Sequence, residues 1–242
     1  MEYLDGRIFW DPALNDLGQD NQARFEIYDA MNQTLAKLHS VDVSAVGLGD
    51  FGKPGSYFAR QTDRWAKQYR ASEVEHNPTV HAVIDWLEQH MPADDGRVSI
   101  VHGDYRMDNM IFAHDRQDVI AVLDWELSTL GHPLADLAYQ CMQWRLPYQS
   151  GMRGLGGIDR GALGIPTEEQ YVASYCRRRG IESIPDWPFY IAFCFFKLTG
   201  ILQGVYKRAL DGNASNPKRA KEMAHAIPLL AEAAMAEIKR SS

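Results

Sequence analysis

The segment 102–109, which reads HGDYRMDN, brings a carboxylate, a guanidinium and an amide close together. Asp104 is followed by Arg106 two positions later and by Asn109 five positions later. A carboxylate can accept a proton from a hydroxyl group, a cation can stabilise a phosphoryl group in transfer, and an amide oxygen can bind Mg²⁺. We therefore predict that Asp104 and Arg106 are catalytic residues of phosphoryl transfer and that Asn109 contacts metal and nucleotide.

A second carboxylate lies at the end of a hydrophobic run. Residues 119–123 read VIAVL and lead into Asp124, which lies 15 residues after Asn109. Mg²⁺ prefers hard oxygen ligands and keeps several waters, so these two side chains and phosphate oxygens would form a plausible shell. We predict that Asp124 binds the metal and the nucleotide, and that Glu126 reaches the metal or one of its waters.

Two further polar residues flank this region. His102 opens the first segment, and Asp136 lies in residues 131–138, which read GHPLADLA. Polar side chains in loops commonly serve as caps and turn formers. We therefore predict that Asp136 braces the loop through hydrogen bonds and that His102 supports the structure.

Other suggestive patterns lack the context that their chemistry needs. Residues 47–53 (GLGDFGK) match the spacing of a phosphate-binding loop, but Pro54 replaces the required hydroxyl residue and no β-rich run precedes the loop. We predict a surface loop between helices there, and a flexible segment at 151–164. The run Arg177 to Arg179 is interpreted as a solvated helix end, with an anion-binding role as the alternative.

Hydrophobic periodicity predicts the elements that position these residues. Helices are expected at about 20–39, from Ser56 as an N-cap, after Pro78, at 134–144, from Thr167 to Gly180, and at 187–210 and 217–239. Short strands are expected at 98–101 and at 119–123, with a further short strand before the turn at 114–118. The fold class is therefore α+β and mostly helical, with a small β element around the predicted catalytic loop.

Composition limits the partners and the compartment. The 242 residues carry a formal net charge of −7 and are 45% hydrophobic, which suits a globular core and argues against nucleic acid and anionic membranes as partners. The three cysteines lack disulfide or zinc-site spacing. Because no signal region and no apolar run near ~20 residues is recognised, we expect a cytoplasmic protein without membrane contact.

Three motifs together carry a family resemblance: HGDxxxxN at 102–109, LDWE at 123–126 and GxPxxDLA at 131–138. They resemble the aminoglycoside phosphotransferase and choline kinase superfamily. Residues 122–131, 175–180 and 196–206 look more closely like the phosphotransferase-like domain of acyl-CoA dehydrogenase family members ten and eleven, and this likeness covers nearly the whole chain.

The resemblance implies a fold and an activity. Residues 1–242 would form the C-terminal, large lobe of a protein-kinase-like fold, with a catalytic and metal-binding core at 98–138 and C-terminal helices at 165–242. The implied activity is ATP- and Mg²⁺-dependent phosphorylation of a small-molecule hydroxyl. A hydroxyacyl-CoA is the favoured acceptor, and an aminoglycoside-type antibiotic is the alternative.

The first residues resemble the hinge that joins two kinase lobes. Residues 1–10 look like this hinge, so Glu2, Tyr3 and Leu4 are expected to contact the nucleotide, and the small lobe is expected to be absent. On that expectation the chain alone is weakly active or inactive and self-associates through the exposed surface. Two alternatives follow, a weak acyl-CoA or small-molecule binding module and a metal-dependent phosphohydrolase that uses the carboxylates at 104, 108 and 124 with His102.

Overall fold

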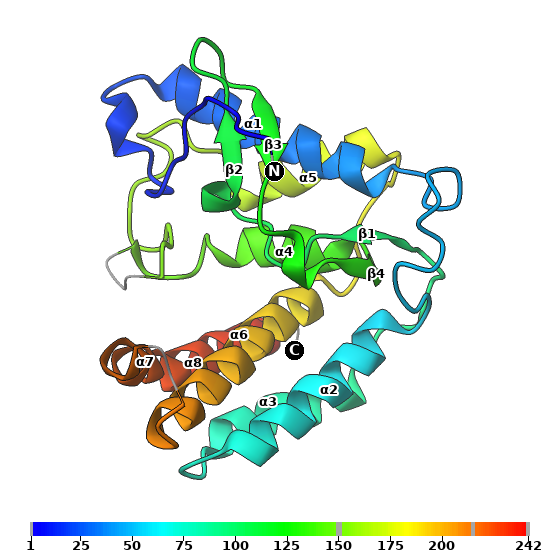
Figure 1. Cartoon of the computed structure of the whole chain (residues 1–242), viewed down its shortest axis with the longest axis vertical. Helices are drawn as coiled ribbons and strands as arrows, with labels where there is room; N and C mark the ends of the chain where they lie inside the picture. Colours follow the sequence, from blue (N-terminus) through cyan, green and yellow to red (C-terminus); the bar gives the residue numbers. More distant parts are fainter. Residues whose placement is uncertain (1, 149–151, 214–215, 241–242) are drawn as a thin grey trace. The chain divides into compact units, whose positions relative to one another are not determined.

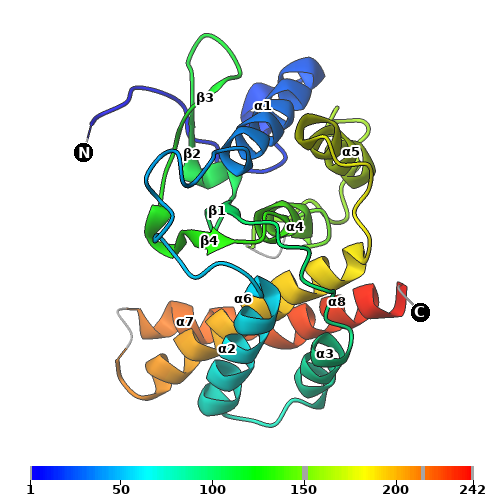
Figure 2. The same ribbon diagram turned by 90° about the vertical axis from the view of Figure 1, so that its right-hand side faces the viewer.

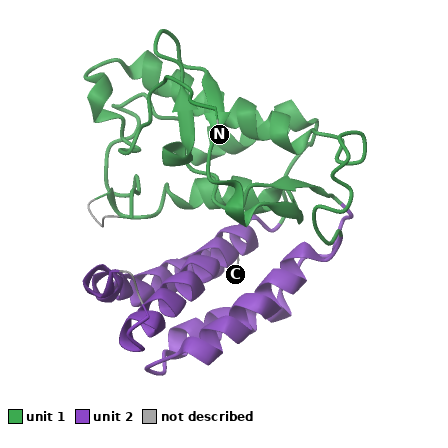
Figure 3. Cartoon of the chain, in the orientation of Figure 1, with its two compact units in different colours: residues 1–54, 97–185 green, residues 55–96, 186–242 purple. Residues whose placement is uncertain are grey.

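The computed structural model describes residues 2–148, 152–213 and 216–240. Its contacts divide the chain into two compact units, one formed by residues 1–54 and 97–185 and the other by residues 55–96 and 186–242 (Figure 3). All residues of the predicted loop and metal site belong to the first unit. Each unit is described by itself below.

The first unit contains the helices η1 (Asn15–Leu17), α1 (Asn21–His39), α4 (Leu134–Met142) and α5 (Glu168–Arg179) (Figure 1). Helix α1 begins where the Asp20 side chain accepts the Ala23 N–H. Its buried residues recur at three- and four-residue steps, which confirms the predicted amphipathic helix. Helix α5 packs against α1. It starts with the predicted capping box of Thr167 and Gln170 and ends at Gly180, whose φ is 64°.

Two short antiparallel ladders complete the first unit (Figure 2). Strand β1 (Ser99–Val101) pairs with β4 (Thr129–Gly131), and β2 (Met110–Phe112) pairs with β3 (Val119–Val122). The 3-10 turns η2 (Met107–Asn109) and η3 (Trp125–Leu127) lie beside them. The strand, loop, strand, turn, strand order is the predicted one, whereas β4 was not predicted because its three residues carry no strand pattern of their own.

The loop at 46–54 packs against strand β4 at Gly52. A Cβ atom on Gly52 would lie 2.4 Å from Thr129 Oγ1 and 2.6 Å from the Leu130 nitrogen. Only a residue without a side chain can therefore approach β4 here. The predicted surface loop between helices is present, and this close approach accounts for Gly52.

The second unit is helical and contains α2 (Tyr57–Ser72), α3 (Pro78–Gln89), α6 (Trp187–Leu210), α7 (Pro217–Ala224) and α8 (Ala226–Arg240). The ring of Phe58 on α2 lies 5.0 to 5.8 Å from the rings of Phe189, Tyr190 and Phe193 on α6. Among the described residues, α6 is the one helix long and apolar enough to span a membrane, but 78% of its apolar window is buried in the structure. Its burial is that of a core helix, as its aromatic content predicts.

Two local predictions about helices were wrong. Ser56 occupies the N-cap position of α2, but its side chain accepts no capping hydrogen bond, because its backbone is left-handed (φ 46°) and not extended as in a capping residue. Its own N–H donates to Asp94 Oδ2. The single long helix expected at 217–239 is divided at His225 into α7 and α8. Pro228 explains the break, since proline has no N–H for the bond to residue 224 and is tolerated only near a helix start.

Candidate functional site

The loop that follows β1 is held at its start by one buried carboxylate. Asp136, in the first turn of α4, accepts the His102 N–H at 2.6 Å and the Gly103 N–H at 2.8 Å, one on each carboxylate oxygen. Gly103 has φ 88°, and a Cβ there would lie 2.7 Å from the Leu127 carbonyl oxygen. The loop therefore requires glycine at 103 and an acceptor at 136.

A buried histidine from α1 completes the surroundings of Asp136. His39 Nε2 lies 3.3 Å from Asp136 Oδ2, and its Nδ1 lies 2.7 Å from the Tyr175 hydroxyl on α5. Burial lowers the pKa of His39, although the Asp136 carboxylate opposes this effect. Burial alone would raise the pKa of Asp136, but His39 and the two backbone N–H groups outweigh it and hold that pKa below its usual range. The pair is therefore an ionised carboxylate with a neutral imidazole.

The His102 ring links the loop to the chain just before Asp124. Its Nε2 lies 2.7 Å from the Leu123 carbonyl oxygen, and its Nδ1 accepts the Asp104 N–H at 3.2 Å. These contacts require the tautomer that carries the proton on Nε2. The Trp125 ring packs against the imidazole at a centroid distance of 4.9 Å. His102 is thus completely buried and its two ring nitrogens serve the backbone.

The three residues first singled out from the sequence are brought together. Asn109 Nδ2 donates to the Asp104 carbonyl oxygen at 2.9 Å and to Asp104 Oδ2 at 3.0 Å. Arg106 Nε lies 3.2 Å from Asp104 Oδ1, an ion-pair distance without hydrogen-bond geometry. The Asn109 amide nitrogen is used in orienting Asp104, so its Oδ1 is the atom left to bind a cation.

Asp124 is placed beside this cluster by the β2–β3 ladder. Met110 pairs with Val122, and the Leu123 N–H donates to the Asn109 carbonyl oxygen at 2.8 Å. Asp124 follows in a left-handed conformation, with φ 64°, and its side chain is exposed. Left-handed backbone is uncommon for residues other than glycine and often occurs at functional sites.

The electrostatics of Arg106 also connect the carboxylates. Burial would lower the pKa of Arg106, but Tyr139 and the carboxylates of Asp104, Asp108 and Asp124 raise it above its ordinary value. The guanidinium therefore stays charged among acidic side chains, which limits their mutual repulsion. Glu126 is exposed on the turn η3, two residues beyond Asp124.

The hinge-like residues lie apart from these contacts. Glu2, Tyr3 and Leu4 are exposed, with Tyr3 at 86%, and no contact joins them to the Asp104 cluster within the described part of the chain. The first backbone pairing with a strand is at Arg7, which forms two hydrogen bonds of 2.8 Å with the backbone of Phe112 on β2. Their predicted nucleotide contacts stay predictions.

Two residues that contact the loop were not identified from the sequence. One is His39, which contacts Asp136. The other is Arg153, which donates to Asp108 Oδ2, an atom that also lies 3.2 Å from Arg106 Nη2. The Arg153 guanidinium lies 4.7 Å from the centre of the Trp10 ring. Arg153 comes from the glycine-rich segment, where the only available signal was an arginine among glycines.

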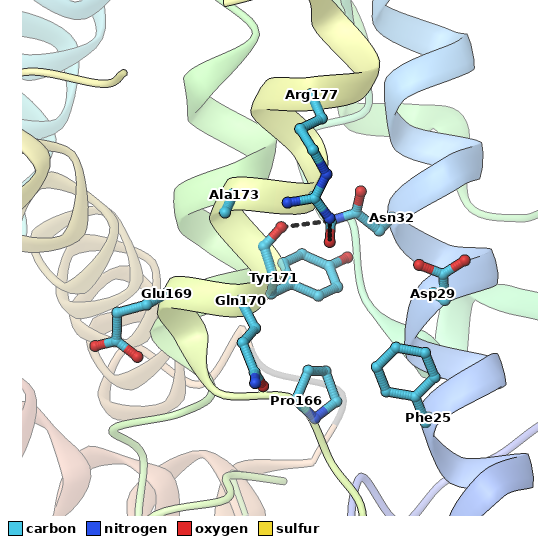
Figure 4. A pocket seen from close by; sticks show the side chains of 10 residues that line it. Phe25, Asp29, Asn32, Pro166, Glu169, Gln170, Tyr171, Ala173 and Arg177 are labelled. Atoms are coloured by element: carbon cyan, nitrogen blue, oxygen red, sulfur yellow. Dashed lines mark hydrogen bonds between the residues drawn. The ribbon is translucent and has the colours of Figure 1, made fainter. Parts of the chain in front are cut away.

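The arginine run at the end of α5 is mostly engaged in packing. Arg178 donates to both oxygens of Asp29 at 2.7 Å and to Asn32 Oδ1 at 2.7 Å. Arg177 lines a pocket of about 410 Å³ between α1 and α5, in which Asn32 donates to the Tyr171 carbonyl oxygen (Figure 4). None of the residues that line this pocket belongs to the Asp104 cluster, and we assign it no part in phosphoryl transfer.

Comparison with known proteins identifies relatives along most of the chain. The sequence profile described as the phosphotransferase enzyme family matches residues 1–188. The chain is 49% identical over 217 residues to acyl-CoA dehydrogenase family member 10 of Mus musculus and 43% identical over 217 residues to family member 11 of Rattus norvegicus. Each match covers 89% of this chain but only 20% and 28% of the relatives' own lengths.

A solved structure agrees with this relationship. A crystal structure from Ralstonia eutropha, of a protein provisionally assigned as an aminoglycoside phosphotransferase, is 47% identical and superposes with a TM-score of 0.94. The superposition covers 99% of this chain and 72% of that one. Two macrolide 2'-phosphotransferases and a choline kinase from Cryptosporidium parvum, at 13% to 17% identity, share the fold, with TM-scores of 0.56 to 0.59. The predicted kinase-like fold class is confirmed.

We expect Asp136→Asn to destabilise the protein by roughly 1–3 kcal/mol, because the amide has one acceptor oxygen for three N–H donors and leaves a buried donor without a partner. Urea denaturation at pH 7.5 measures the change. Asp115→Asn is the control, since its side chain is 77% exposed and substitution there should change stability by less than about 0.5 kcal/mol. Equal effects of the two substitutions would contradict the bracing role.

We also expect stability to fall as the pH is lowered from 8 to 5.5. The folded pKa of His39 is depressed, so the unfolded chain, in which histidine titrates near about 6.5, binds more protons in this window. Denaturation at several pH values in His39→Gln should give a shallower slope, whereas His114→Gln, at an exposed histidine, should keep the slope of the parent protein. An unchanged slope in His39→Gln would refute the assignment.

Proposed function

The chain belongs to the phosphotransferase enzyme family, and we propose that, together with a small lobe, it transfers the γ-phosphoryl group of ATP to a small-molecule hydroxyl with the help of Mg²⁺. The observation that carries the proposal is the double hydrogen bond from the Asn109 amide to Asp104. It orients the Asp104 carboxylate, which would serve the acceptor, together with the Asn109 amide oxygen, which would bind the metal. The ladder between β2 and β3 then adds Asp124 beside them.

The residues at this point suit Mg²⁺. Asn109 Oδ1 and the exposed Asp124 carboxylate are both hard oxygen donors, which Mg²⁺ prefers. Few protein ligands are needed, because this ion usually keeps several waters and binds phosphate oxygens as well. Glu126 would contact the ion or one of its waters from the adjacent turn. When bound, Mg²⁺ neutralises charge on the phosphates.

Asp104 would act on the acceptor. Its carboxylate orients the acceptor hydroxyl and accepts the proton as the hydroxyl oxygen bonds to the γ-phosphorus. The bond from that phosphorus to the oxygen shared with the β-phosphate breaks, and its electron pair leaves with ADP. Arg106, held beside Asp104 and Asp108, keeps a positive charge near the transferring group. At the end of the step the proton of the acceptor hydroxyl is on Asp104, and Arg106 has kept all of its own protons.

For the acceptor we propose the hydroxyl of a hydroxyacyl-CoA. Two relatives at 49% and 43% identity are named as acyl-CoA dehydrogenase family members, which connects this type of chain with acyl-CoA chemistry. An aminoglycoside-type antibiotic is the second candidate, supported by the assignment of the Ralstonia eutropha protein. The compartment we propose is the cytoplasm, because the three cysteines are free and buried, as is usual in a reducing environment.

The proposed roles predict different defects for two aspartates. In a form of the protein that also carries a small lobe, Asp124→Asn should remove Mg²⁺-dependent ATP binding, whereas Asp104→Asn should leave that binding nearly unchanged and lower turnover by about 10²–10⁴-fold. Asparagine at 104 keeps an acceptor for the Asn109 amide, so the loop geometry should survive. Calorimetry with ATP and Mg²⁺ and a phosphate-transfer assay measure the two effects, with Asp115→Asn as the exposed control. Equal loss of ATP affinity in both variants would contradict the division of roles.

The acceptor is tested with radiolabelled ATP and a panel of substrates. We expect label transfer to hydroxyacyl-CoAs and none to the matching acyl-CoAs that lack the hydroxyl, because only the hydroxyl can attack the phosphorus. Aminoglycosides in the same panel should remain unlabelled. Labelled aminoglycosides would favour the antibiotic kinase, and metal-dependent ATP binding without any transfer would favour the binding module.

A further inference from the structure

A cluster of metal-binding side chains lies in the second unit, where the proposed phosphotransferase chemistry does not require it. Glu73, His76 and His81 each offer a ligand atom, and these atoms all lie within 4.8 Å of one another. Glu73 is at the end of α2, His76 is in the connection, and His81 is in the first turns of α3. The three ligands therefore come from nine consecutive residues that join two packed helices.

The separations within the cluster fit a tetrahedral ion. His81 Nε2 lies 2.9 Å from Glu73 Oε1 and 3.0 Å from Oε2, and His76 Nδ1 lies 3.6 Å from Oε1. Zn²⁺ binds nitrogen and oxygen at about 2.0–2.2 Å in tetrahedral sites, which places neighbouring ligand atoms about 3.3 Å apart. The observed separations lie on both sides of this value, so small rotations of the side chains would suffice.

The local packing explains the Glu73–His81 pair but not the position of His76. Glu73 Oε1 accepts the Asn77 N–H at 3.1 Å, and Asn77 in turn caps α3. His76 makes no hydrogen bond within the described residues and is 71% exposed, yet its ring lies 4.7 Å from the His81 ring. Two imidazoles beside one carboxylate, with one of them otherwise unused, form a recognised zinc-ligand set of two histidines and a glutamate.

The surroundings would orient the carboxylate and leave space for a further ligand. The Tyr69 ring lies 6.0 Å from the His81 ring, and the Asn77 N–H holds Glu73 Oε1 at 3.1 Å. His76 also lines a pocket of about 460 Å³. A solvent water on the exposed side of His76 could complete a site with three protein ligands.

We propose that Glu73, His76 and His81 bind Zn²⁺. The ion would take the position of the hydrogen on His81 Nε2, and the ring would bind as the neutral tautomer that carries its proton on Nδ1. Bound in this way, it would fasten the end of α2 to the start of α3. The site is independent of the Asn109 and Asp124 oxygens, which suit Mg²⁺.

The test is zinc binding by tag-free, chelator-treated protein, measured by calorimetry and by metal content after dialysis. We expect one Zn²⁺ per chain in this site and no displacement by millimolar Mg²⁺. Substitution of a residue that only orients a metal ligand typically weakens metal affinity by about 10–100-fold. His76→Ala and Glu73→Gln each remove a direct ligand, so either should weaken zinc binding by at least about 100-fold. The exposed His76 has no hydrogen bond to lose, so His76→Ala should fold normally and decides the result if Glu73→Gln does not.

The matched control is His114→Ala. His114 Nε2 lies 3.0 Å from Asp5 Oδ1, which forms a histidine–carboxylate pair. This pair is not part of a three-ligand group among the described residues, so the substitution should leave zinc affinity unchanged. Absence of zinc binding by the parent protein, or equal affinity in the parent and His76→Ala, would overturn the proposal.

Discussion

The site depends on the burial of one charge, the carboxylate of Asp136. A buried carboxylate would cost several kcal/mol if it were left without partners. Here it accepts from two successive backbone N–H groups and from His39, whose other ring nitrogen contacts Tyr175. A single group thus connects α1, α4, α5 and the start of the loop after β1. The loop cannot move away without leaving the charge unpaired, so its geometry is fixed before any ligand binds.

A second set of contacts connects the loop to Asp124, the proposed metal ligand. His102 contacts the Leu123 carbonyl oxygen, and the Leu123 N–H returns to Asn109. The chain then enters the left-handed conformation at Asp124, which would be unfavourable in isolation. The contacts of Leu123 hold the backbone that presents the exposed Asp124 carboxylate. Electrostatic catalysis needs this kind of preorganisation, since groups that are already oriented need not reorganise during the reaction.

Sequence reasoning succeeded where the information is local. The motif residues 104, 106 and 109 lie within one short loop, and the Thr167 capping box and Gly180 set the limits of α5 by nearest-neighbour chemistry. It missed His39 and Arg153, which are separated from their partners by 97 and 45 residues. Nothing near His39 in the sequence distinguishes a buried partner of Asp136 from an ordinary helix-end histidine. The strand β4 and the division at His225 likewise depend on tertiary pairing and on the effect of a proline three residues further on.

The two groups of ligands in this chain differ in a way that separates two kinds of metal chemistry. Asn109 and Asp124 offer only oxygens, and the exposed carboxylate leaves room for water and phosphate, which suits an ion that is held partly by its substrate. Glu73, His76 and His81 add two imidazole nitrogens, which favour zinc over magnesium because zinc binds nitrogen far more strongly. A magnesium ion would gain little at the imidazoles. A zinc ion at the oxygen pair would lack nitrogen ligands, so the two proposed sites differ in the ion that their donor atoms favour.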